Sequence, residues 1–224
     1  MGKLLEDPTL RDRVHVFKDR ARAGRLLAQR LLGYRGKGVR VFAVPAGGVP
    51  VAAEIVRALE VPLDLVIVRK IQLPWTTEAG FGALNPAGEA IFNEALLRRV
   101  HLSREDIDTQ KQKTLATLKE REAQLRNNRP YPDLAGAAAI IVDDGLASGY
   151  TMRAAIHFLK GKGAGKIIVA VPTAAVQTAE ELLPLVDELL CLNLRGGWSF
   201  AVAEAYEDWY DLTEKEVMEI MEQL

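Results

Sequence analysis

The sequence of 224 residues contains one cysteine, Cys191, and only 6% aromatic residues. A single thiol excludes an internal disulfide framework and is compatible with a reducing compartment, and its apolar neighbours predict a small buried side chain. No apolar run approaches the roughly 18 residues of a membrane span, and residues 1–10 lack the apolar segment of a secretory signal. We therefore expect a cytoplasmic protein with no membrane partner.

An excess of charge is also missing, because 29 lysines and arginines face 30 acidic residues and the net charge is −1. Nothing in this balance indicates nucleic acid as a partner. His15, His101 and His157 fall on helical patterns without metal-ligand spacing, so we expect surface or hydrogen-bonded side chains. The length and the 49% hydrophobic composition suit one domain with a buried core.

Residues 139–151, AIIVDDGLASGYT, hold the most informative pattern. An apolar run leads into two acids and then into a turn of small residues that opens a helical pattern, which predicts a buried strand, a loop and a helix. Free N–H groups at a helix N-terminus bind phosphate, and small residues allow close approach. Because carboxylates repel phosphate, Asp143 and Asp144 are expected to face hydroxyl groups or a hydrated cation. The alternative is an ordinary strand-to-helix turn with two solvated aspartates.

Further apolar runs at residues 39–44, 63–68, 166–171 and 188–193 predict strands. Helical patterns separate them, with helices expected at about residues 17–32, 50–59, 103–126, 151–160, 176–183 and from 213. Continuous apolar strands that alternate with helices indicate a parallel sheet covered on both faces, with ligands at the carboxyl ends of the strands. The loop Pro45-Ala46-Gly47-Gly48 and the pair Arg69-Lys70 are expected at that edge.

Two segments interrupt this alternation. Residues 71–93 contain scattered prolines and glycines and no clear period, which indicates either a mobile lid or a β-hairpin packed on the body. Residues 194–212 are rich in aromatic side chains and precede the last helix.

The segment IIVDDGLASGYT resembles the signature with which type I phosphoribosyltransferases bind phosphoribosyl pyrophosphate (PRPP): four apolar residues, two acids and a small-residue loop that ends Ser/Thr-Gly-x-Thr. The resemblance extends over about residues 39–195. It implies an α/β fold, a mostly parallel twisted sheet with helices on both faces, plus a lid excursion and a C-terminal hood. We expect one domain over residues 1–224, with a core at about 36–195, the lid at about 71–93, the hood at about 194–212, and N- and C-terminal helices.

The resemblance also implies an activity, the Mg²⁺-dependent transfer of the 5-phosphoribosyl group from PRPP to a nitrogen acceptor, usually a nucleobase, with release of pyrophosphate. Asp143 and Asp144 would bind the ribose hydroxyls, and Mg²⁺ would be held mainly through PRPP with these two acids nearby. The 5-phosphate is assigned to Ala147, Ser148, Gly149, Tyr150 and Thr151, and the pyrophosphate to Ala46, Gly47, Gly48, Arg69 and Lys70. The catalytic set is then Asp143, Asp144, Arg69 and Lys70.

The acceptor is less well defined. By chain position its pocket is expected at the hood, with Thr173, Trp198, Phe200 and the lid residue Trp75 as candidates, although aromatic clusters are also common in plain cores. Position 147 is alanine where the hypoxanthine-guanine branch carries an aspartate, which disfavours that branch.

Position 46 is alanine where many relatives carry arginine or another side chain that contacts pyrophosphate, so a PRPP- or nucleotide-binding regulator with little turnover is the main alternative. A PRPP synthetase shares a similar ribose-phosphate loop, but the chain is short for one and shows no ATP-binding signature. A homo-oligomer stays open.

Overall fold

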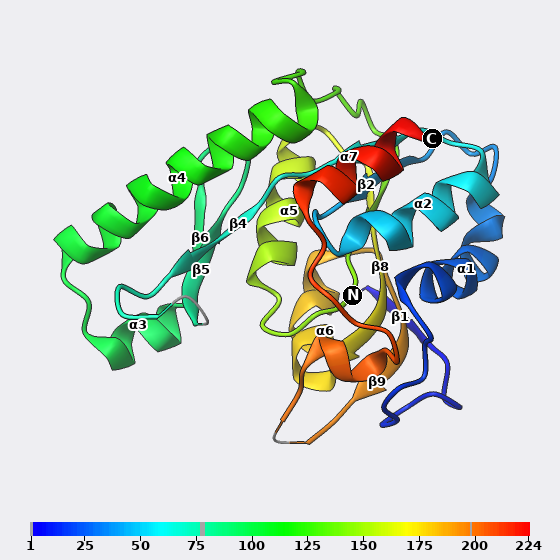
Figure 1. Cartoon of the computed structure of the whole chain (residues 1–224), viewed down its shortest axis with the longest axis horizontal. Coiled ribbons are helices and arrows are strands. Elements are labelled where there is room, and N and C mark those ends of the chain that lie inside the picture. The colour runs from blue at the N-terminus through cyan, green and yellow to red at the C-terminus, as the bar shows by residue number, and fades with distance from the viewer. Residues whose placement is uncertain (1, 77–78, 198) are drawn as a thin grey trace.

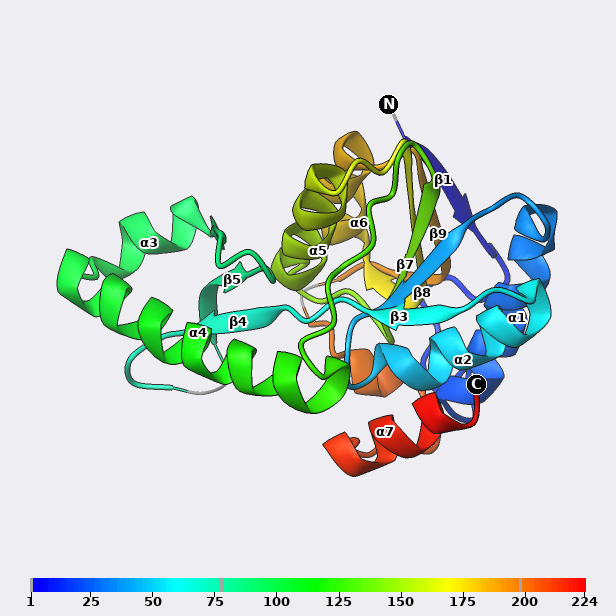
Figure 2. The same cartoon turned by 90° about the horizontal axis from the view of Figure 1, so that it is seen from above.

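The computed structural model describes residues 2–76, 79–197 and 199–224, and its main sheet has six parallel strands in the order β1-β9-β8-β7-β2-β3. The strands are β1 (Lys3–Glu6), β2 (Arg40–Ala43), β3 (Leu63–Leu65), β7 (Ala138–Val142), β8 (Lys166–Ala175) and β9 (Glu188–Arg195). All their pairings are parallel, so their carboxyl ends lie at one edge of the sheet (Figures 1 and 2). The predicted mostly parallel α/β sheet is confirmed.

Helices cover both faces of this sheet. The helices α1 (Arg20–Leu31), α2 (Gly48–Leu59) and α7 (Glu214–Glu222) pack on one face, and α5 (Tyr150–Gly161) and α6 (Val176–Leu182) on the other. Side chains along β7 alternate between the two cores, Ile140 and Val142 facing α1 and α2 while Ala139 and Ile141 face α5. Short 3₁₀ turns lie at Leu32–Tyr34, Leu183–Leu185 and Val202–Ala205. No helix in the described ranges is both long and apolar enough to span a bilayer.

A second, antiparallel sheet leaves the body between β3 and β7. It consists of β4 (Arg69–Gln72), β5 (Gly80–Leu84) and β6 (Ala90–Phe92) and is followed by α3 (Glu94–Val100) and α4 (Arg104–Arg126). We call residues 69–126 the arm, because in Figure 1 they extend sideways from the main sheet. The expected β-hairpin at residues 71–93 is therefore present, whereas its movement as a lid stays a prediction.

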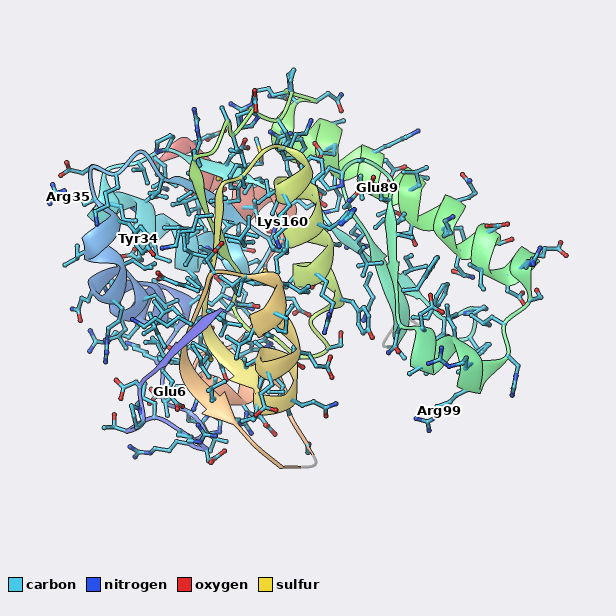
Figure 3. All side chains as sticks on the ribbon, turned by 180° about the vertical axis from the view of Figure 1, so that it is seen from behind. Glu6, Tyr34, Arg35, Glu89, Arg99 and Lys160 are labelled. Atoms are coloured by element: carbon cyan, nitrogen blue, oxygen red, sulfur yellow. The ribbon has the colours of Figure 1, made fainter. Side chains whose placement is uncertain are left out.

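The arm touches the body along α5. Glu89, at the turn between β5 and β6, lies 3.3 Å from Nε2 of His157 in α5. Figure 3 shows Glu89 on the side of the arm nearest the body and Arg99 beside α3. The predicted helix over residues 103–126 is confirmed, and Ser103 and Asp106 form its capping box.

Several elements differ from expectation. The first helix begins at Arg20, because the Asp19 side chain caps it by accepting from the N–H of Arg22, and residue 17 pairs with the hood instead. The edge strand β1 was not predicted. The strand predicted at residues 63–68 ends at Leu65, because the chain then leaves the main sheet and enters the arm at Arg69. Finally, β8 continues past Pro172 to residue 175, which is possible because the neighbouring β7 has already ended at Val142, opposite Ala170.

Candidate functional site

The site lies where β2 and β7 end side by side. The N–H of Val44 donates to the carbonyl of Val142 over 2.9 Å, which brings the loop before α2 against the loop before α5. A methyl group on Gly48 would lie 2.5 Å from that same carbonyl, so a side chain at this position would separate the two loops. The parallel register thus brings together the two segments that the family resemblance assigned to the two ends of PRPP.

The loop at residues 145–149 is open to solvent at its tip. Ala147 and Ser148 are exposed, and Gly149 takes a left-handed conformation with φ of 74° directly before α5. The first-turn N–H groups of a helix have no intrahelical acceptor, and no side chain caps α5. The Thr178 hydroxyl, from α6, donates to the carbonyl of Ala147 and anchors the loop. An anion can therefore reach the N–H groups of Tyr150 and Thr151.

The acid pair sits deeper than this loop. Oδ1 of Asp143 accepts the N–H of Asp144 over 2.9 Å. Burial, together with the neighbouring Asp144 charge, raises the pKa of Asp143 well above its ordinary value. Burial also raises the pKa of Asp144, and the Arg20 guanidinium opposes that rise.

Arg20 is the site residue that sequence reasoning missed. Its Nε lies 2.8 Å from Oδ2 of Asp144 and its Nη1 donates to the carbonyl of Tyr210 over 2.9 Å. The guanidinium also lies 3.9 Å from the ring centre of Trp209, and the residue is only 6% exposed. Arg20 precedes Asp144 by 124 residues and stands among several arginines of one helix, so no local pattern marks it.

The hood closes over the acid pair from the other side. The Tyr206 hydroxyl donates to the backbone carbonyl of Asp144 over 2.6 Å, and its ring packs on Trp209 with 5.3 Å between ring centres. A cavity of about 330 Å³ lies on the outer side of Arg20, lined by Asp19, Arg20, Ala21, Pro50, Asp208, Tyr210 and Leu212. A larger cavity, of about 730 Å³, lies between the C-terminal ends of α2, α4 and α7 and contains no predicted site residue.

The loop before α2 is partly buried at Ala46 and Gly47. The N–H groups of Gly48 and Val49 already donate to the carbonyls of Val44 and Ala46. A pyrophosphate here would therefore depend on the remaining N–H groups, those of Ala46 and Gly47. The peptide bond between Pro45 and Ala46 is cis.

Arg69 and Lys70 do not converge on one point. They are consecutive residues of β4, so their side chains point to opposite faces of the arm sheet. Ile71, which shares a face with Arg69, packs in the core beneath α4, and burial together with the Arg69 charge lowers the pKa of Arg121 in α4. Nε of Arg121 lies 2.9 Å from the Glu214 carboxylate of α7. The stem of Lys70 lies against Gly80 on the other face.

The acceptor candidates are scattered. Thr173 is fully buried and its hydroxyl lies 2.7 Å from Oδ1 of Asn193. Phe200 lies beneath Arg195, with 5.3 Å from the guanidinium to the ring centre, and Trp75 is 62% exposed on the arm. Trp198 lies outside the described residues. Thr173, Phe200 and Trp75 thus come from β8, the hood and the arm, whereas Trp209 and Tyr210, which were not singled out, lie next to Arg20.

The acid pair offers few ligands for a metal. Among residues 2–76, 79–197 and 199–224 no group of three or more histidine, cysteine, aspartate or glutamate side chains could hold a metal ion. Two adjacent carboxylates, one already paired with Arg20, fit a cation whose other ligands come from a bound substrate.

A parallel α/β sheet with an open helix N-terminus and an acid pair at its carboxyl edge has its candidate site where open α/β sheets bind their ligands. The profile of the phosphoribosyl transferase domain matches residues 87–207, and the chain belongs to this family. The predicted membership in an enzyme family of phosphoribosyltransferases is thereby confirmed.

Two Mycobacterium tuberculosis proteins, named "Putative phosphoribosyl transferase MT0597" and "Putative phosphoribosyl transferase Rv0571c", are each 37% identical over 207 residues, 92% of this chain. The chain spans 46% of the length of these relatives. The crystal structure of TT1426 from Thermus thermophilus is 31% identical and superimposes with a TM-score of 0.74 over 92% of this chain and 98% of that one. The AQ2163 protein from Aquifex aeolicus, 11% identical, shares the fold with a TM-score of 0.51 over 84% of this chain and 78% of that one.

Proposed function

We propose that the protein transfers the 5-phosphoribosyl group of PRPP to a nitrogen acceptor, most simply a nucleobase, and releases pyrophosphate. One observation carries the proposal: the glycine loop before α2 and the open loop before α5 meet at the ends of β2 and β7, with Asp143 and Asp144 between them. Two helix N-termini favour anions at two ends of one ligand, and the acids between them favour its hydroxyl groups. PRPP has this distribution of charge.

Each part of PRPP then has a partner in the chain. The 5-phosphate would lie on residues 147–151, and the ribose hydroxyls would face the acid pair. The pyrophosphate would lie at Ala46, Gly47 and Gly48, with the Arg69-Lys70 region contributing positive charge. Mg²⁺ would be bound mainly by pyrophosphate oxygens and would neutralise part of the leaving group's charge.

In the reaction the bond from C1 of the ribose to the pyrophosphate oxygen breaks, and its electron pair leaves with the pyrophosphate. The acceptor nitrogen supplies the electron pair of the new C1–N bond, and the proton it carried is lost to water. Positive charge on the ribose and negative charge on the leaving group grow together, so positioned donors and acids lower the barrier. A closed arm would keep water from intercepting the ribosyl cation, which gives the predicted lid a role.

Pyrophosphate release tests this function. The chain is incubated with PRPP, Mg²⁺ and a panel of purine and pyrimidine bases, and pyrophosphate is measured over time. The expected result is release that depends on one base and falls at least about a hundredfold when Asp143→Asn and Asp144→Asn are combined. Release without any base, or equal release by the double variant, would contradict the proposal.

A PRPP- or nucleotide-binding regulator is the second candidate. Two observations favour it: Ala46 offers no charged side chain to pyrophosphate, and Arg20 already neutralises one of the two acids. A regulator would bind PRPP without releasing pyrophosphate for any base on the panel, so the same assay combined with calorimetric titration separates the two functions.

A further inference from the structure

Asp144 contacts three parts of the protein itself: the Arg20 side chain, the Tyr206 hydroxyl and the loop before α2. Its Oδ2 accepts from Nε of Arg20 over 2.8 Å, and its backbone carbonyl accepts from the Tyr206 hydroxyl over 2.6 Å. On the third side the carboxylate touches the loop before α2, where a Cβ on Gly47 would lie 1.9 Å from Oδ2. The side chain is 14% exposed. Asp144 is therefore fixed between α1, the hood and the glycine loop.

Asp143 has a different environment. Its Oδ1 accepts the N–H of the next residue, and no cation is paired with it among the described residues. Two neighbouring acids with unequal partners are not equivalent, because the paired one is neutralised in place and the other keeps its capacity to accept new hydrogen bonds.

Arg20 also reaches the hood. One guanidinium donates to Asp144 and to the carbonyl of Tyr210 and stacks 3.9 Å from the ring centre of Trp209. A planar fork with several donors and a face that stacks on an aromatic ring can make these contacts together, and a lysine ammonium cannot. A shift of Arg20 would thus move the hood and the Asp144 carboxylate at the same time.

We infer that Arg20 is a positioning residue of the sugar site: it holds Asp144 as a fixed anion against the glycine loop, so that Asp143 is the acid that meets the ribose diol, and it sets the hood relative to that acid. This inference rests on the proposed function, because it divides the two acids of the proposed ribose site into one that binds and one that orients. It assigns a role to a residue of α1, which lies outside the signature.

The first test is a comparison of ligands that differ only in the diol. The dissociation constants of ribose 5-phosphate and 2-deoxyribose 5-phosphate are measured by calorimetry for the wild type and for Arg20→Gln. The wild type is expected to favour the ribose compound by about tenfold, the effect of one good hydrogen bond to a charged group. Arg20→Gln is expected to lose most of this preference and to keep its affinity for inorganic phosphate within about threefold, because the hydrogen bonds of Arg20 go to Asp144 and Tyr210 and not to the loop at residues 145–149.

A double-mutant cycle then separates the two acids. In the Arg20→Gln background, Asp144→Asn should weaken ribose 5-phosphate binding by less than about twofold further, because the pair acts as one unit. In the wild-type background, Asp143→Asn alone should remove the preference for the ribose compound, because it removes the acid that meets the diol. Arg20→Lys keeps the charge without the planar fork, so we expect it to keep part of the preference for the ribose compound. The matched control is Arg30→Gln, which removes an exposed arginine of the same helix that is paired with Asp7.

Two results would overturn the inference while leaving the proposed function standing. The first is that both Arg20 variants keep the wild-type diol preference and the wild-type affinity for PRPP. The second is that the losses of ribose 5-phosphate affinity in Arg20→Gln and Asp144→Asn multiply in full in the double variant. If the wild type binds neither PRPP nor ribose 5-phosphate, the proposed function fails and the inference falls with it. Thermal melts of every variant show whether a loss of binding reflects the site or the fold.

Discussion

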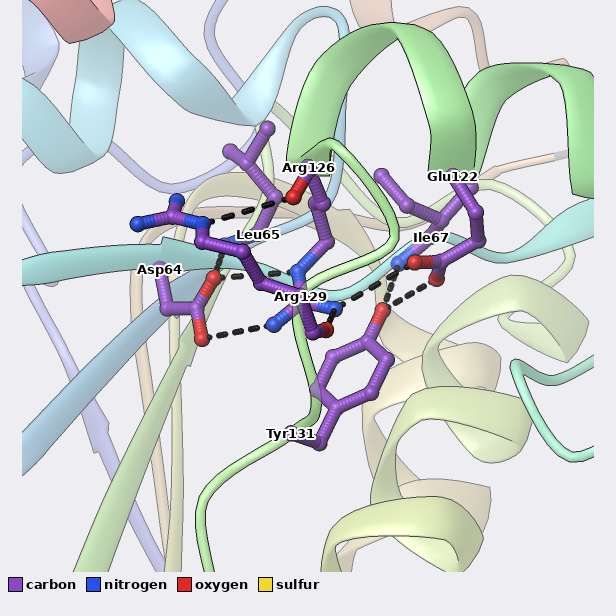
Figure 4. A network of polar contacts seen from close by, with 7 residues as sticks. All are labelled: Asp64, Leu65, Ile67, Glu122, Arg126, Arg129 and Tyr131. Carbon is purple, nitrogen blue, oxygen red and sulfur yellow. Dashed lines mark hydrogen bonds and ion pairs between the residues drawn. The ribbon is translucent and has the colours of Figure 1, made fainter.

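The guanidinium of Arg126 lies 3.5 Å from the ring centre of Tyr131 while its Nε and Nη2 donate to the two carboxylate oxygens of Asp64, over 3.1 and 3.0 Å. Figure 4 shows this network, in which the Tyr131 hydroxyl also lies 2.5 Å from Glu122 and accepts the N–H of Ile67. The contacts join the end of α4 to β3 and to the residues that lead into the arm. The arm is thereby fixed at its base on both of its connections to the body.

Replacing Arg126 should unfold the base of the arm. The Arg126 side chain is 1% exposed, so Arg126→Met leaves the Asp64 and Glu122 carboxylates without their partner in a poorly solvated place. Removing one partner of a buried ion pair costs about 3–5 kcal/mol, and we expect a loss of this size in urea unfolding. The control is Arg57→Met. The Arg57 side chain is 46% exposed and pairs with Glu54, and its removal should lower the free energy of unfolding by less than about 1 kcal/mol. Equal effects in the two variants would contradict a structural role for the network.

Asp143→Asn should stabilise the fold at neutral pH while weakening sugar binding. Burial and the Asp144 charge raise the pKa of Asp143 in the folded protein, so the native state binds more protons than the unfolded state between the ordinary pKa of 3.8 and the raised value. Stability therefore falls as pH rises through this window, and the asparagine variant, which does not titrate, escapes the loss. We expect its melting temperature to exceed that of the wild type by a few degrees at pH 7, since about 1 kcal/mol shifts a domain of this size by about 2–4 °C.

The same comparison at low pH supplies the check. Near pH 3.8 and below, both states of the wild type bind the proton, so the difference in melting temperature should shrink toward zero. A difference that is independent of pH would mean that the Asp143 carboxyl is not destabilised by its surroundings.

The sequence pattern predicted the parts of the site whose information is local. Residues 139–151 contain a strand, two acids, a turn and a helix start in one stretch, and the structure has this order, with an exposed tip at Ala147 and Ser148. The two covered faces of the sheet followed from continuous apolar runs, because the central strands β7 and β8 bury both of their sides.

Longer-range features were not predictable in the same way. The pairing of Arg20 with Asp144 depends on the path of the hood, which brings Tyr206 and Trp209 to the start of α1. The opposite orientation of Arg69 and Lys70 depends on their lying within a strand of the arm and not in the loop beyond β3. Neither leaves a mark in composition or spacing, since both arise from tertiary packing.

Gly149→Ala should weaken phosphate binding strongly. The residue has φ of 74°, and a Cβ would lie 2.7 Å from Cγ2 of Thr178, which anchors the loop through the Ala147 carbonyl. Both strain and contact would push the loop off the α5 N-terminus, so we expect the affinity for inorganic phosphate to fall about tenfold or more, measured by calorimetry. Gly136→Ala is the matched control, because Gly136 has φ of 84° with nothing within 4 Å and suffers the backbone strain alone. Similar phosphate affinities in the two variants would mean that the α5 loop does not bind the anion.

Gly47→Ala isolates the contact between the glycine loop and Asp144. Gly47 has helical dihedral angles, φ −60° and ψ −32°, so alanine fits its backbone, and the three atoms nearest to the new methyl group all belong to the Asp144 carboxyl group. Nε of Arg20 lies 2.8 Å from Oδ2 of Asp144 on the opposite side, so the methyl group must displace either Asp144 or the loop. We therefore expect the affinity for PRPP to fall about tenfold or more, with a smaller change in the affinity for inorganic phosphate. Gly161→Ala, at the end of α5, is the control, because nothing lies within 4 Å of its new methyl group. This variant should bind PRPP as the wild type does and gain about 0.5–1 kcal/mol of stability. Undiminished PRPP affinity in Gly47→Ala would place the sugar away from the junction of the two loops.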